Sequence, residues 1–73
     1  MNNGLKILDV VALSKDLPEK HLLKGQVGAI VEDFGDNTYL IEFSDNNGHV
    51  YAAEELKTKY FIKLHYEPEP EYA

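Results

Sequence analysis

The chain has 73 residues, enough for one small domain, and it contains no cysteine, so disulfides and thiolate metal ligands are excluded. Thirteen acidic residues against seven lysines and no arginine give a formal net charge of −6, which argues against a general affinity for nucleic acid. The N-terminus shows neither a secretory signal nor a membrane-length apolar run. We therefore expect a cytoplasmic protein without membrane contact.

The first elements along the chain are a strand and a long loop. Residues 9–13 are apolar after Asp9 and contain two adjacent valines, which predicts a first strand. Residues 14–26 are mostly polar and contain Pro18, which disfavours a helix interior. They predict an ordered loop, with a single turn at residues 21–23.

A three-strand meander is predicted next, with strands at residues 27–33, 38–43 and 49–53 and turns at residues 35–37 and 45–48. In the first of these strands, Val27, Ala29 and Val31 share one face, and Gly28, Ile30 and Glu32 share the other. A glycine within a strand is typical of a bulge or a close backbone approach, so Gly28 is predicted to be structural.

Two interpretations of the C-terminal third are open. Residues 53–56 suit one helical turn and residues 60–64 a fifth strand, because the Tyr-Phe-Ile sequence favours strand. Alternatively, residues 52–64 form a helix in which Glu55 and Lys59 are four residues apart. Residues 66–73 alternate proline with glutamate, which predicts an extended, flexible acidic tail after a domain spanning residues 1–65.

The order of these elements predicts a mainly β fold. A strand, a long loop, a three-strand meander, a single helical turn and a last strand together define a small, partly open, five-stranded SH3-like barrel. We expect no second domain and no internal repeat.

Four stretches within residues 7–64 form a recognisable pattern: LDVVAL, GQVGAIVE, YLIEFSD and GHVYA. Together they resemble a family of short bacterial proteins, common in cyanobacteria, that is classed as a domain of unknown function. Residues 25–31 are also similar to the opening of other SH3-like barrels, including KOW-type ribosome and transcription domains and small accessory subunits of photosynthetic complexes. The resemblance implies a fold and brings no activity with it.

Catalytic and metal-binding patterns are missing. The histidines at positions 21, 49 and 65 are far apart in sequence, so no close pair nucleates a metal site. Neighbouring carboxylates such as Glu32 and Asp33 point to opposite faces within a strand and do not form a catalytic dyad. We expect a protein that is not an enzyme and holds no cofactor or metal.

The expected function is binding to a protein partner, as an adaptor, an accessory subunit or an immunity-like or antitoxin-like protein. The candidate contacts are the loop residues Lys15, Lys20, Leu22, Leu23 and Lys24 and the tyrosines Tyr39 and Tyr51, which offer cations, exposed leucines and large amphipathic rings. We expect a monomer or a weak homodimer. The alternative is RNA or other nucleic-acid binding through a lysine face beside Tyr60 or Phe61. Signalling-type recognition of proline-rich peptides is not expected, because the chain has no tryptophan.

Overall fold

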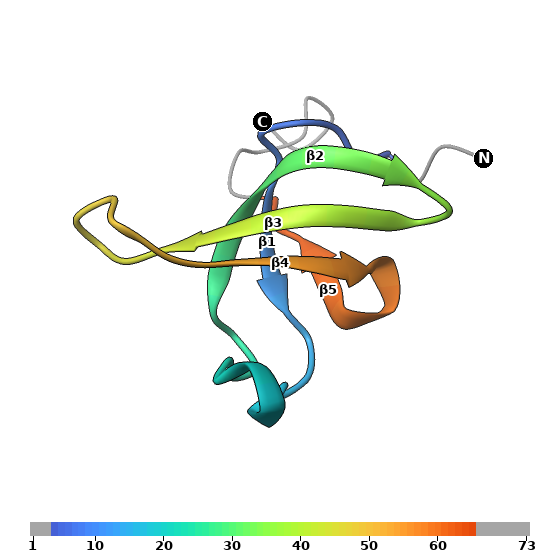
Figure 1. The fold of residues 1–73 in the computed structure, drawn as a ribbon. Coiled ribbons are helices and arrows are strands. Elements are labelled where there is room, and N and C mark those ends of the chain that lie inside the picture. The colour runs from blue at the N-terminus through green and yellow to red at the C-terminus, as the bar shows by residue number, and fades with distance from the viewer. Residues whose placement is uncertain (1–3, 66–73) are drawn as a thin grey trace.

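The computed structural model describes residues 4–65, so the predicted tail at residues 66–73 lies outside the described residues. One antiparallel sheet has the order β4-β3-β2-β1-β5 (Figure 1). Its strands are β1 (Val10–Leu13), β2 (Val27–Gly35), β3 (Thr38–Ser44), β4 (Val50–Lys57) and β5 (Phe61–Lys63). The sheet curls so that β1 and β5 lie behind β3 and β4, and β4 and β5 remain its two edges. The prediction of a partly open, five-stranded SH3-like barrel is confirmed.

The long loop after β1 closes on itself. Its one 3-10 turn, η1 (Pro18–Lys20), begins at the proline, whose fixed φ and missing N–H suit a first turn position. The turn predicted at residues 21–23 is therefore misplaced by three residues. Leu17 and Leu22 exchange backbone hydrogen bonds of 2.8 and 3.1 Å, which fold the loop back on itself.

The hairpin between β2 and β3 has a two-residue turn. Asp36 and Asn37 have φ angles of 54° and 61°, the left-handed conformation that matches the twist of the flanking strands. Strand β2 therefore runs two residues beyond the predicted end, to Gly35, which lies opposite Thr38.

A bulge in β2 changes the predicted faces of that strand. Ile30 lies opposite Ile41, but the next paired residue is Glu32, opposite Leu40. The extra residue turns Glu32 onto the outer face of the sheet, away from Gly28 and Ile30, so the expected shared face is wrong. The physical reason is that regular pairing would direct this carboxylate into the core.

Strand β4 is longer than predicted, and the helical turn comes later. Residues 53–56 continue the strand, because Leu56 lies opposite Tyr39 and both side chains are buried. The turn is η2 (Thr58–Tyr60), and β5 follows it immediately. The alternative helix over residues 52–64 is wrong for the same reason. Pairing with β3 as a strand buries Leu56 against Tyr39.

The core lies between the curled halves of the sheet and the first loop. On β3, Tyr39, Ile41 and Phe43 are buried and alternate with residues that face outward. The other buried core side chains are Val11, Leu13, Leu17, Leu22, Ile30, Leu56 and Phe61.

Candidate functional site

Three glutamates surround Leu40 on the outer face of the sheet. Glu32 of β2 and Glu55 of β4 each lie directly opposite Leu40, and Glu42 lies two residues further along β3. Since Leu40 and Glu42 alternate with the buried residues of β3, all four side chains are on the solvent side. We call Leu40 with these three glutamates the acidic outer face.

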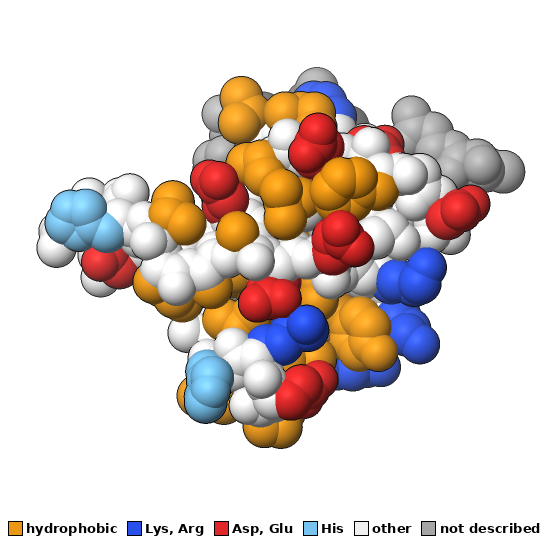
Figure 2. All heavy atoms as spheres, viewed as in Figure 1, with side chains coloured by type: hydrophobic (Ala, Val, Ile, Leu, Met, Phe, Trp, Pro, Cys, Tyr) orange, Lys and Arg blue, Asp and Glu red, His pale blue; other side chains and the backbone are white. Residues whose placement is uncertain are grey.

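Two cross-strand rows of apolar residues continue this surface across the sheet. In one row, Val10, Ala29 and Ala53 lie in register with Glu42. In the next, Ala12 lies between Val27 and Ile62, which are 42% and 57% exposed. Figure 2 shows acidic and apolar side chains interleaved over β2, β3 and β4.

The charges on the acidic outer face are not neutralised within the described residues. Glu32, Glu42 and Glu55 form no ion pair there, whereas Lys20 pairs with Glu54 and Lys63 with Asp9. Like charges on one face of a sheet oppose folding slightly. A cationic partner would remove that repulsion. Alternation along β3 is the sequence signal for Glu42, but none of the three glutamates was predicted as a site residue.

A cationic cluster lies at the side of the barrel formed by η2. The ammonium groups of Lys15 and Lys59 lie 5.5 and 5.3 Å from the centre of the Tyr60 ring. Lys57, also exposed, donates hydrogen bonds to the Thr38 hydroxyl at 3.2 Å and to the Asp36 carbonyl at 3.5 Å. Lysine side chains gather beside η2 in Figure 2.

The predicted contacts of the first loop are separated by the structure. Lys15, Leu23 and Lys24 are exposed, and Leu23 reaches 59%. Lys20 is only partly exposed, and its ammonium group lies 3.1 Å from Glu54 Oε1. The Lys24 side chain has no ion pair among the described residues, so Lys24 is the loop lysine most available to a partner.

Two of the predicted contacts are buried, and their predicted exposure is wrong. Leu22 is 1% exposed, because its backbone bridge to Leu17 directs the side chain into the core. Tyr39 is 5% exposed and packs edge-to-face on Phe61, with ring centres 6.1 Å apart. Neither side chain is accessible to a partner in this fold.

Tyr51 differs from Tyr39 because it remains half exposed. It lies at the irregularity where β3 and β4 change register, after Phe43. Its hydroxyl accepts a hydrogen bond of 3.1 Å from Gln26 Nε2, which connects β4 to the end of the first loop. Its ring also lies 6.5 Å from that of Phe43. Tyr51 is therefore an available contact that is held in position from two sides.

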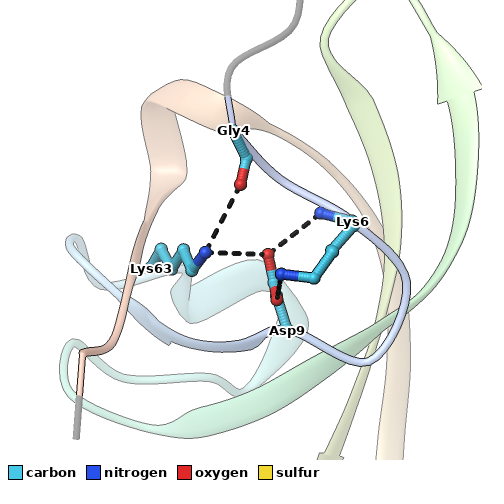
Figure 3. Close-up of polar contacts among 4 residues, drawn as sticks. All are labelled: Gly4, Lys6, Asp9 and Lys63. Atoms are coloured by element: carbon cyan, nitrogen blue, oxygen red, sulfur yellow. Dashed lines mark hydrogen bonds and ion pairs between the residues drawn. The ribbon is translucent and has the colours of Figure 1, made fainter. Parts of the chain in front are cut away.

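A carboxylate fixes the N-terminal segment to β5, as Figure 3 shows. Asp9 accepts a hydrogen bond from the Lys6 backbone N–H at 2.9 Å and pairs with the Lys6 and Lys63 ammonium groups at 3.2 and 3.3 Å. Partial burial alone would raise the pKa of Asp9, but these contacts outweigh it and lower the pKa. Lys63 also donates a hydrogen bond to the Gly4 carbonyl. Asp9 and Lys63 therefore have a structural role, because they hold the N-terminal segment against β5.

The described residues contain no group of three or more histidine, aspartate or glutamate side chains placed to hold a metal ion. Over the same range, no helix has the length and apolar character needed to cross a bilayer. His49 lies in the β3–β4 loop, 3.6 Å from Asp45, and His21 ends η1. His65 is exposed beyond β5.

The fold and its surfaces define a small SH3-like barrel with two exposed regions of opposite charge. Residues 7–63 match the family described as "Domain of unknown function (DUF4926)", and the chain belongs to that family. The predicted family resemblance is thereby confirmed. Neither the curated proteins nor the solved structures contain a match to this chain.

Proposed function

We propose that this protein is a non-catalytic, cytoplasmic interaction module that binds a basic protein through the acidic outer face. The observation that carries the proposal is the position of Glu32, Glu42 and Glu55 around Leu40, with no cation paired to them among the described residues. Such a surface complements lysine or arginine side chains.

The apolar rows beside these glutamates favour a protein over a small cation. Protein interfaces combine an apolar centre with charged residues that set orientation and speed of association. Val27 of β2 supplies exposed apolar area, and Ala29 and Ala53 lie opposite Glu42 on either side. Phosphate groups would be repelled by the same carboxylates, so nucleic acid does not fit this face.

Binding by a monomer fits the charge of the chain. A net charge of −6 opposes close association of two copies through the same acidic surface. We therefore expect the protein to bind its partner as a monomer and not to pair with a second copy of itself through this face. A basic toxin-like or regulatory protein would fit this chemistry.

The test compares capture of partners by the full chain and by the variant E32Q/E42Q/E55Q, in lysate of the source organism treated with nuclease. The charge-matched control is E67Q/E69Q/E71Q, which removes three charges outside the described residues. We expect a basic protein to be captured by the natural chain and the control and lost from the outer-face variant. The purified pair should then bind at least about tenfold more weakly when the three outer glutamates are neutralised.

Two results would overturn the proposal. Equal capture by the outer-face variant would show that the partner binds elsewhere. Equal loss with the control variant would show that net charge, and not this face, controls association. Circular dichroism of each variant confirms that the barrel is intact.

A further inference from the structure

The cationic cluster beside η2 is built from two segments that are far apart in sequence. The Ser14 backbone N–H donates to the Tyr60 carbonyl at 2.9 Å, and the Ser14 hydroxyl donates to the Lys59 carbonyl at 3.5 Å. These bonds hold the end of β1 against η2. As a result, Lys15 and Lys59 extend over one ring, that of Tyr60.

The two ammonium groups have only weak partners. Neither forms an ion pair with a carboxylate among residues 4–65, although ten acidic residues lie in that range. Contact with an aromatic ring leaves the N–H donors of each lysine free to bond to a carboxylate. The cluster can therefore accept an anion without first breaking an ion pair.

We propose that Lys15, Tyr60 and Lys59 form a second binding site, which takes an acidic segment of a protein. A carboxylate beside the Tyr60 ring would accept hydrogen bonds from the ammonium group of Lys15 or Lys59, and the exposed Lys57, two residues before Lys59, adds positive charge.

Two observations favour a protein segment over single-stranded nucleic acid. Base stacking needs an open ring face, and both lysines extend over the Tyr60 ring. Beyond this cluster, the surface is negative, since ten acids and seven lysines lie within residues 4–65. A long polyanion would be repelled where it leaves the site, whereas a short acidic segment would not.

This site is independent of the acidic outer face, and the two carry opposite charges. If both are occupied, the module connects a basic protein to an acidic one, which is the action of an adaptor. Each site can be removed separately, so failure of one proposal leaves the other testable.

The experiment is an NMR titration of the full chain with a glutamate-rich octapeptide, a glutamine-rich octapeptide and an eight-nucleotide oligothymidylate. We expect the glutamate peptide to change the chemical shifts of the Tyr60 ring and of the Lys15 and Lys59 side chains. The affinity for this peptide should fall at high salt. Lys15→Gln and Lys59→Gln should each weaken binding by about three- to tenfold. Lys24→Gln, at an exposed lysine outside the cluster, should change it less than about twofold.

The outcomes that oppose the proposal are equally specific. No binding of the glutamate peptide, or equal binding by Lys15→Gln and Lys59→Gln, removes the site. Tighter binding of oligothymidylate than of the peptide replaces the acidic protein with nucleic acid. The variant E42Q/E55Q should bind the peptide as the natural chain does, which separates this test from that of the outer face.

Discussion

Gly28 on β2 lies directly opposite Phe43 on β3, so close that a Cβ atom at position 28 would lie 3.0 Å from Phe43 Cδ1. The same atom would lie 2.7 Å from the Glu42 carbonyl oxygen and from Ile41 Cγ2. A side chain at this position therefore meets backbone as well as core, and the two strands can pack this closely only with glycine.

Gly28→Ala should lower the free energy of unfolding by about 1–3 kcal/mol, the usual cost of overpacking a core. The contact with a backbone oxygen cannot be relieved by rotating a side chain. Urea denaturation measures the effect. Gly48→Asn is the comparison, because Gly48 has open space around it and its replacement costs only backbone strain at a φ of +80°, which asparagine adopts more readily than most residues. Equal stability of Gly28→Ala and the natural chain would contradict the close approach.

Leu22→Ala should destabilise the protein by about 2–5 kcal/mol, because it removes a buried side chain and leaves a cavity. Its neighbour provides a matched control. Leu23→Ala should change stability by less than about 0.5 kcal/mol, since Leu23 is mostly exposed. Thermal unfolding of both variants checks the difference, and similar melting temperatures would show that the first loop does not pack as described.

Asp9→Asn should lower stability at pH 7 by on the order of 1 kcal/mol, because the amide keeps the shape of the group and loses its charge. The pKa of Asp9 is lowered in the folded state. Its contribution is therefore present above the unfolded pKa of about 3.9 and is lost as pH falls through the lower folded value. Urea denaturation between pH 7 and pH 2 should show the two proteins converging at acidic pH. A constant difference would mean that the ionised carboxylate is not responsible.

Much of the fold is contained in local patterns of the sequence. Alternation at residues 38–43 places Tyr39, Ile41 and Phe43 on one face of a strand, which the structure buries, and the turn residues around Asp36 and Gly48 predict both hairpins. These features depend on neighbours in sequence, so they can be read without knowledge of the tertiary structure. The fold class follows from their order.

The missed features depend on contacts between distant residues. The end of β4 is set by Leu56 against Tyr39, which no pattern within residues 52–64 reveals. The choice of Leu22 over Leu23 for the core depends on the bridge to Leu17. The acidic outer face could not be predicted without the bulge in β2. Glu32 lies opposite Leu40 only because of this one-residue change in register.

The ion pair between Lys20 and Glu54 leads to a final prediction, because it connects η1 to the edge strand β4. Lys20→Glu and Glu54→Lys should each lower stability by up to about 1 kcal/mol, and the double variant should recover most of the loss. Lys24→Glu should have almost no effect on folding. Chemical denaturation of the natural chain, the two single variants at this pair and the double variant gives the coupling energy, and strictly additive losses would show that the pair contributes nothing. Charge reversal at Lys24 is therefore a clean probe of binding by the first loop, whereas reversal at Lys20 also changes the fold that presents it.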